Sequence, residues 1–185
     1  MDSPAVAVRP ATVADALGIA RVQVDTWRSA YAGIVPEAHL AALSHDLRAA
    51  RWRSMLSGPP GAEWTFVAEA NDQRVVGFAS GGRERGDGDA YDGELYAIYV
   101  LAEHQGGGLG RRLTAAVVDR LTAAGYSSML VWALERNPWR RFYERLGGLP
   151  VRSRIVELSG VGLSEVAYGW RDLPALYRRC LGVDG

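Results

Sequence analysis

Hydrophobic residues recur along this chain with two different periods, and together these predict a mixture of strands and helices. Runs rich in β-branched and aromatic residues predict strands at 6–9, 64–69, 74–80, 94–100, 151–158 and 165–170, with one more after residue 125. Apolar residues spaced by three and four predict helices at 17–31, 36–43, 47–56, 109–124, 137–146 and 173–181. The polar turn at 71–73 should join two neighbouring strands into an antiparallel hairpin.

The order of these elements predicts the fold class. A strand, two or three helices, a hairpin, and then strands alternating with helices favour a mixed, mostly antiparallel sheet with helices on both faces. This is an α/β (α+β) domain in three layers. The 185 residues, 48% of them hydrophobic and 23% charged, suit one domain spanning 1–185.

The stretch from Glu94 to Tyr143 carries the chemistry. A buried strand leads into Gln105-Gly-Gly-Gly-Leu-Gly-Arg-Arg112, and this turn opens an apolar helix. Glycines before a helix leave backbone N–H groups exposed at its positive end, which is the usual setting for a bound pyrophosphate. The P-loop pattern fails because no Lys follows the glycines, and the dinucleotide pattern fails because its third glycine falls on Arg111.

The pattern that does fit is Gln-x-x-Gly-x-Gly, with Gln105, Gly108 and Gly110 as its fixed points. With the strand before it and the helix bearing Tyr143 after it, this segment resembles the acyl-CoA-binding core of the GNAT N-acetyltransferase superfamily. The order of elements resembles the GNAT fold over nearly the whole chain. The resemblance implies an acetyl-CoA-dependent N-acetyltransferase. It assigns cofactor binding to Ile98, Tyr99, Val100, Gln105, Gly106, Gly107, Gly108, Leu109, Gly110, Arg111, Asn137 and Tyr143.

Composition narrows the setting of this activity. Lys+Arg and Asp+Glu both number 21, so the chain lacks the cationic excess of a nucleic-acid binder. The single Cys180 forms no internal disulfide, and no signal peptide or membrane-length apolar run is evident, so we expect a cytoplasmic protein away from membranes. The three histidines show no ligand spacing, and no metal is predicted. The sequence leaves homodimer formation open.

Acetyl transfer from a thioester to an amine requires an uncharged amine, a stabilised oxyanion and an acid for the departing thiolate. Tyr143 is the candidate acid, since the family has a Tyr near the CoA sulfur. Its alternative role is that of a core aromatic residue. Asn137 should begin the helix, with Pro138 at its first position and Trp139, Phe142, Tyr143 and Leu146 facing inward. Related chains commonly place one residue more between this Asn and Tyr, which puts the pantetheine contact of Asn137 in question.

Glu94 is the second catalytic candidate, because many family members carry a carboxylate there that relays a proton from the amine. It is equally a solvated acid at a strand end. Tyr96 is the runner-up to Glu94 in the same region. Strict alternation would place four residues on one face of the strand: Glu94, Tyr96, Ile98 and Val100. A bulge expected from the family would change that face and expose backbone groups around Ile98–Val100 to the pantetheine.

The acceptor side is least determined by sequence. Trp27 and Tyr31, one helical turn apart, and Tyr96 are the candidate substrate-binding residues, although a helical aromatic pair is more often core. Asp87, Asp89 and Asp92 either attract an ammonium group or form a solvated loop. The aromatic pair favours a small-molecule amine. A protein or peptide N-acetyltransferase and a non-catalytic acyl-CoA sensor are the alternatives.

Overall fold

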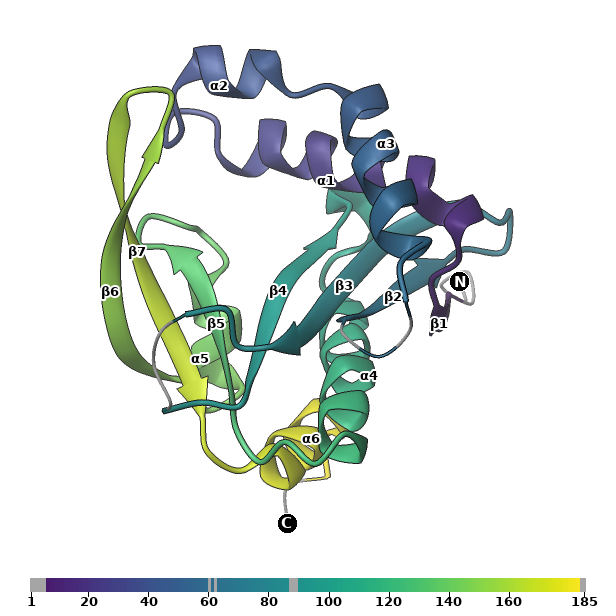
Figure 1. Cartoon of the computed structure of the whole chain (residues 1–185), viewed down its shortest axis with the longest axis vertical. Helices are drawn as coiled ribbons and strands as arrows, with labels where there is room; N and C mark the ends of the chain where they lie inside the picture. Colours follow the sequence, from purple (N-terminus) through teal and green to yellow (C-terminus); the bar gives the residue numbers. More distant parts are fainter. Residues whose placement is uncertain (1–5, 60, 62, 87–89, 184–185) are drawn as a thin grey trace.

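The computed structural model describes residues 6–59, 61, 63–86 and 90–183, which form one sheet with helices on both faces (Figure 1). The strands are β1 (Ala7–Pro10), β2 (Glu63–Glu69), β3 (Val75–Arg83), β4 (Gly93–Val100), β5 (Met129–Leu134), β6 (Leu149–Leu158) and β7 (Val161–Trp170). The α-helices are α1 (Ala16–Ala30), α2 (Glu37–Ala42), α3 (His45–Leu56), α4 (Leu109–Ala123), α5 (Arg140–Arg145) and α6 (Leu173–Leu181). Asp87 and Asp89 lie outside the described residues.

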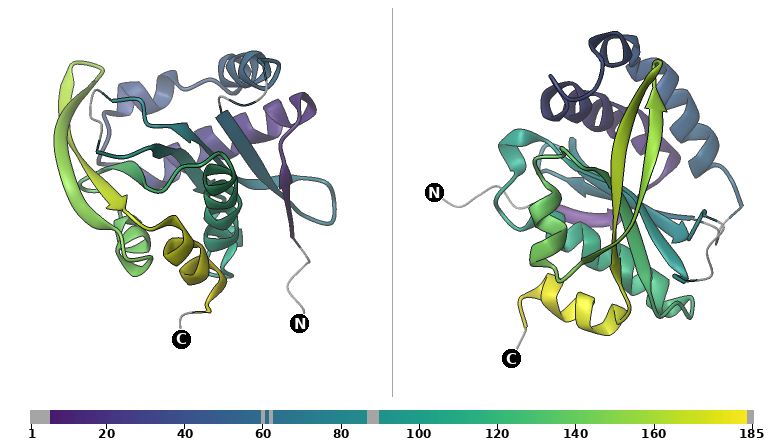
Figure 2. Two further views of the ribbon diagram at one scale, coloured as in Figure 1. Left: turned by 60° about the horizontal axis from the view of Figure 1, so that its bottom comes forward. Right: turned by 90° about the vertical axis from the view of Figure 1, so that its left-hand side faces the viewer.

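The sheet has seven strands in the order β1-β2-β3-β4-β5-β7-β6. Among the strands of the described residues only β4 and β5 pair in parallel, and each of the other neighbouring pairs is antiparallel. The predicted fold class and the β2–β3 hairpin are confirmed. The final pair, β6 and β7, begins earlier than predicted and makes a long two-stranded arm beside the rest of the sheet (Figure 2).

Helices α1, α2 and α3 lie over one face of the sheet, and α4, α5 and α6 lie over the other (Figures 1 and 2). Beneath α4 and α6 a core forms around the fully buried Leu113, Leu121 and Leu176. Beneath α1 and α3 a second core forms around Ile19 and Phe78. Within the described part of the chain, none of the helices combines the length and the hydropathy needed to cross a bilayer.

A short helical turn before α1 carries the predicted capping pair. Thr12 precedes the turn, and its backbone N–H donates to Asp15 Oδ2 at 2.7 Å. Arg9 on β1 also donates to Asp15, at 2.8 Å, so the first strand and the first helix are held together by one carboxylate.

Strand β4 contains the bulge that the family resemblance implies. Ser80 of β3 pairs with Ala97, whereas the next residue, Gly81, pairs with Leu95, so Tyr96 has no partner in β3. Gly81 suits this position because helix α4 packs so closely on β3 that a Cβ at residue 81 would lie 2.6 Å from a methyl carbon of Val117. The bulge is therefore matched by a glycine on the neighbouring strand.

The bulge reverses the alternation of side chains along β4. Leu95, Ile98 and Val100 belong to the core beneath α4, while Ala97 and Tyr99 pack toward α1. The strict alternation set out above, with Glu94 and Ile98 on one face, is wrong because one residue is inserted between them.

We predict that Gly81→Ala lowers the free energy of unfolding by about 1–3 kcal/mol, because the new methyl group overpacks the contact with α4 and with the Glu94 carbonyl. Gly107→Ala is the matched control: a Cβ there meets nothing within 4 Å, and its effect should stay within about 0.5 kcal/mol. Urea denaturation measures both. Equal stabilities for the two variants would contradict the close approach at the bulge.

Candidate active site

The site begins where β4 and β5 separate. Their parallel pairing covers only Gly93↔Met129, Glu94↔Leu130 and Leu95↔Val131. Beyond Leu95, no strand of the described residues pairs with the edge of β4 that faces β5. The Leu101 N–H donates to Val76 O on the β3 side, so by alternation the backbone groups of Ile98 and Val100 face the gap. Of these groups Val100 O accepts from the Gln105 side chain, so the gap presents the Ile98 N–H and C=O and the Val100 N–H to a ligand.

A cavity of about 500 Å³ fills this gap and extends to both faces of the sheet. Its lining comes from α1, β4, the glycine turn and the first turn of α4, β5, the segment after β5, and α5, with one arginine from α6. The lining residues are Thr26, Ala30, Tyr31, Tyr96, Ala97, Ile98, Tyr99, Val100, Gln105, Gly106, Gly108, Leu109, Gly110, Arg111, Val131, Trp132, Asn137, Trp139, Phe142, Tyr143, Arg145, Leu146 and Arg179. Most of the predicted cofactor-binding residues are therefore brought together around one space.

The glycine turn has the geometry of an anion site. Gly106 and Gly108 adopt left-handed conformations, with φ of 81° and 79°, which side chains rarely tolerate. Gly108 is the N-cap of α4, and no side chain caps the helix there. The first N–H groups of α4 have no helical partner, so they and the positive end of the helix dipole are available to a phosphate.

Two side chains predicted to bind the cofactor, those of Gln105 and Arg111, make hydrogen bonds with other parts of the protein. The Gln105 amide donates to Val100 O at 2.8 Å, which ties the glycine turn to the end of β4. The Arg111 guanidinium donates to the backbone carbonyls of Arg179 and Cys180 at the end of α6. Gln105 thus positions the turn, and Arg111 joins α4 to α6, although both residues border the cavity.

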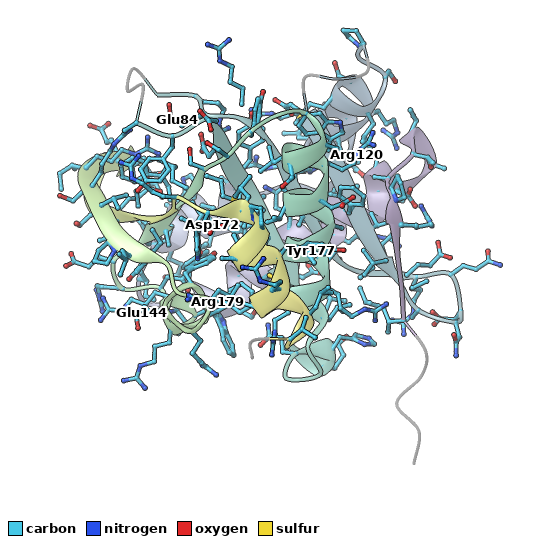
Figure 3. All side chains as sticks on the ribbon, turned by 90° about the horizontal axis from the view of Figure 1, so that it is seen from below. Glu84, Arg120, Glu144, Asp172, Tyr177 and Arg179 are labelled. Atoms are coloured by element: carbon cyan, nitrogen blue, oxygen red, sulfur yellow. The ribbon has the colours of Figure 1, made fainter. Side chains whose placement is uncertain are left out.

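Arginines surround the end of the cavity nearest the glycine turn. Arg111, Arg145 and Arg179 come from α4, α5 and α6 respectively. Figure 3 shows Arg179 projecting from α6 toward α5, where it donates to Leu146 O at 3.4 Å. This end of the cavity therefore carries positive charge near the expected anion.

Tyr143 lies on α5 and is 7% exposed. Its ring stacks on Tyr168 at 5.7 Å and meets Trp170 edge-on at 6.5 Å between centroids. Among the described residues its hydroxyl has no hydrogen-bond partner, although it borders the cavity. Burial raises the pKa of the Tyr143 hydroxyl well above its usual value, so the group keeps its proton at neutral pH. The arrangement suits a proton donor facing a ligand.

The segment before α5 differs from the sequence prediction. The helix begins at Arg140, not at Asn137, and Trp139 is 51% exposed. Asn137 Oδ1 accepts from the Trp139 N–H at 2.8 Å, and this local turn replaces the predicted first helical turn. Because Asn137 precedes the helix, the helical phase between it and Tyr143 sets no constraint.

The C-terminal end of α1 closes the opposite side of the cavity. Tyr31 follows α1, is buried, and its hydroxyl accepts from Asn137 Nδ2 at 3.2 Å. Trp27 stands behind this surface and is absent from the cavity lining within the described residues. Its indole donates to the Tyr99 hydroxyl at 2.9 Å and meets Tyr31 edge-on at 5.0 Å. Trp27 therefore positions two tyrosines that do border the cavity.

Glu94 is buried and engaged in an ion pair. Its Oε1 accepts from Arg85 Nη2 at 2.6 Å, and its Oε2 accepts from the Arg85 backbone N–H at 3.1 Å. The Arg85 guanidinium also lies over the Tyr96 ring, 4.0 Å from its centre, and the Tyr96 hydroxyl donates to Arg83 O at 2.6 Å. Glu94 thus holds the segment after β3 against Tyr96, and the structure does not bring it into the described cavity lining with Tyr143.

Several lining residues had no sequence signal. Thr26 lies inside α1, and its buried Oγ1 is the one buried side-chain polar atom without a partner among the residues that the structure describes. Trp132 comes from β5, and its place in the sequence does not distinguish it from other aromatic residues in strands. Among the described residues no group of three or more His, Cys, Asp or Glu side chains is arranged to hold a metal ion.

Residues 88–155 match the model of the FR47-like protein family. The chain is 42% identical over 172 residues to the uncharacterised N-acetyltransferase YuaI of Bacillus subtilis (strain 168), covering 92% of this chain and 96% of YuaI. An acetyltransferase assigned to the GNAT family from Desulfovibrio desulfuricans superposes with a TM-score of 0.66 at 24% identity, covering 91% of this chain and 99% of that one.

Salmonella typhimurium YncA, whose structure contains its cofactor acetyl-CoA, superposes with a TM-score of 0.64 at 24% identity, covering 90% of this chain and 94% of YncA. The superposition on these solved structures establishes the fold. The 42% identity to YuaI, which extends over nearly the full length of both chains, establishes the family relationship. The chain therefore belongs to the GNAT superfamily of N-acetyltransferases.

Proposed function

We propose that this chain transfers the acetyl group of acetyl-CoA to the primary amine of a small molecule, by direct attack while both reactants are bound. As a GNAT acetyltransferase it uses acetyl-CoA as its co-substrate. The observation that carries the proposal is the cavity that runs from the glycine turn through the gap between β4 and β5 and includes Tyr143 in its lining.

The residues of the cavity fit acetyl-CoA in three sections. The backbone N–H groups of residues 108–111 would hold the pyrophosphate, with the arginines of α4, α5 and α6 adding positive charge. The unpaired edge of β4 at Ile98 and Val100 would pair with the pantetheine amides, as a missing strand would. The thioester would then reach the part of the gap bordered by Tyr143.

Direct transfer needs one proton donor and one uncharged amine. The amine nitrogen forms a bond to the thioester carbonyl carbon, the carbon–sulfur bond breaks, and the sulfur takes the proton of the Tyr143 hydroxyl. The new amide nitrogen then releases one proton to solvent, and the Tyr143 phenolate regains a proton from solvent, so the enzyme returns to its starting state. Holding both reactants in one cavity supplies much of the rate, so no covalent enzyme intermediate is required. Backbone N–H groups on the open edge of β4 are suitable donors to the developing oxyanion.

Packing around the acceptor side favours a small molecule over a peptide. Val156, Leu158 and Leu163 of the β6–β7 arm pack against a cluster that includes Leu40 and Leu43 from the α2 region. His39 on α2 also lies 3.1 Å from the Ser159 hydroxyl at the tip of the arm. The arm and α2 are thus joined over this side, where an extended peptide would need an open groove.

We predict that Gly108→Glu weakens acetyl-CoA binding by about a hundredfold or more, because the new carboxylate would stand where a phosphate must sit. Gly160→Glu is the matched control. Gly160 has the same φ of 79° and the same open surroundings, but it lies in the turn between β6 and β7. Isothermal calorimetry compares the two affinities. If Gly108→Glu binds acetyl-CoA as tightly as Gly160→Glu does, the phosphate assignment is wrong.

We predict that Tyr143→Phe lowers kcat by about 10²–10⁴-fold while acetyl-CoA affinity stays within about threefold, because only the proton donor is lost. Tyr168→Phe removes a hydroxyl from the ring stacked on Tyr143, but that hydroxyl lies 3.3 Å from Glu144. This control should keep its turnover. Release of free CoA thiol gives the rates, and unchanged turnover in Tyr143→Phe would assign Tyr143 to packing alone.

A further inference from the structure

Two carboxylates near the acceptor side of the cavity have cationic partners. Glu94 precedes the lining residues of β4 and is held by two nitrogens of the Arg85 guanidinium. Glu165 on β7 influences the pKa values of Tyr31 and Tyr99, and its Oε2 accepts from Arg154 Nε at 2.8 Å. The charge of each carboxylate is therefore partly neutralised, which weakens its attraction for an ammonium group.

The lining on this side consists of aromatic rings and neutral polar groups. Thr26 and Tyr31 come from α1 and its end, Tyr99 from β4, Trp132 from β5, and Asn137 from the turn after it. Burial raises the pKa values of the Tyr31 and Tyr99 hydroxyls, so both keep their protons at neutral pH. Within the described lining, this side presents hydroxyl, amide and ring surfaces in place of a carboxylate or an imidazole.

Charged groups near the acceptor side are cations or lie outside the described lining. Among the described lining residues, arginines come from α4, α5 and α6, at the cofactor end of the cavity. The Arg154 guanidinium lies over the Trp132 ring, 4.0 Å from its centre, and the His39 ring on α2 lies 5.9 Å from that of Trp27. The remaining titratable groups of the lining are tyrosines whose pKa values are raised chiefly by burial: Tyr31, Tyr96, Tyr99 and Tyr143. The lining thus offers an incoming ammonium group little help in losing its proton.

Thr26 supplies a second, independent indication of a ligand. It is 8% exposed, and its Oγ1 has no hydrogen-bond partner among the described residues, although it borders the cavity. A buried hydroxyl left unpaired is unfavourable, so a bound molecule that pairs with it relieves part of that cost. Because a hydroxyl both donates and accepts, it suits an amide, ester or alcohol group on the acceptor.

Resting on the function proposed above, we infer that the acceptor is a compact α-amino amide or ester, an amine with a larger uncharged fraction at neutral pH than an alkyl amine has, and that Thr26 binds its neutral polar group. An α-amino group has a pKa of about 7.7–8.0, whereas that of an alkyl amine such as Lys is about 10.4. Near pH 7 the α-amino compound therefore offers roughly 300 times more of the uncharged form. Because the described lining provides no carboxylate or imidazole to remove the proton of an ammonium group, the cavity favours the amine with the larger uncharged fraction.

The test uses two acceptors of nearly the same size and shape, alaninamide and 3-methylbutan-2-amine, with spermidine as a polycation. With acetyl-CoA present, thiol release at pH 7 should give alaninamide a kcat/KM at least about tenfold above that of either other amine, since its lower nucleophilicity offsets part of the difference in uncharged form. The rise of kcat/KM with pH should follow the pKa of each amine. A rise at one common pH for all amines would reveal an enzyme base and overturn the inference.

Thr26→Val isolates the hydroxyl, because valine keeps the shape of threonine. We expect kcat/KM for alaninamide to fall by about two- to tenfold and that for 3-methylbutan-2-amine to stay unchanged, since the hydrocarbon amine has no group to pair with Thr26. Equal effects on both acceptors would contradict the contact. Turnover of spermidine but not of alaninamide would overturn the acceptor class and leave acetyl transfer intact. Absence of turnover with every amine, together with absence of acetyl-CoA binding by calorimetry, would overturn the proposed function as well.

Discussion

The separation of β4 from β5 is the constraint on which the rest of the site depends. These two strands hold together through three residue pairs and then part, so the sheet opens in its middle instead of at an edge. The bulge at Tyr96 bends β4 at the point where pairing ends and turns Ile98 and Val100 toward the helical layer of α4. A ligand that enters this opening can form strand-like hydrogen bonds with the Ile98 backbone and the Val100 N–H, while Val100 O is already bound by the Gln105 amide.

The two ends of the cavity differ in charge, and this difference gives each reactant its place. Exposed N–H groups, the dipole of α4 and three arginines make one end suitable for a polyanion. At the other end, carboxylates near the cavity are bound by Arg85 and Arg154, which leaves hydroxyl, amide and aromatic surfaces. The tyrosine at position 143 lies between them, and its raised pKa keeps it in the form that can donate a proton.

The glycine turn and α4 could be predicted from the sequence, because glycines directly before a helical pattern of apolar residues are a short-range signal. In the structure Gly108 adopts the left-handed conformation that favours glycine. The start of α5 was mispredicted since the Asn137 side chain makes a turn that competes with a helical one. Residues whose roles arise from tertiary contacts were beyond sequence reasoning. Thr26 matters because its hydroxyl is left unpaired beside the cavity, and Glu94 is withdrawn because Arg85 folds back over it.

Amide hydrogen exchange, followed by NMR with and without CoA, tests the central claim most directly. The amides of Ile98 and Val100, and those of residues 109–111 in the first turn of α4, should exchange at least about tenfold more slowly when CoA is bound, since the ligand supplies their missing acceptors. Amides of residues 93–95 should be protected in both states, because β5 already pairs there. The claim would be contradicted if CoA left these five amides unchanged and protected instead the groove beside Tyr91 and Trp170, between β7 and α6.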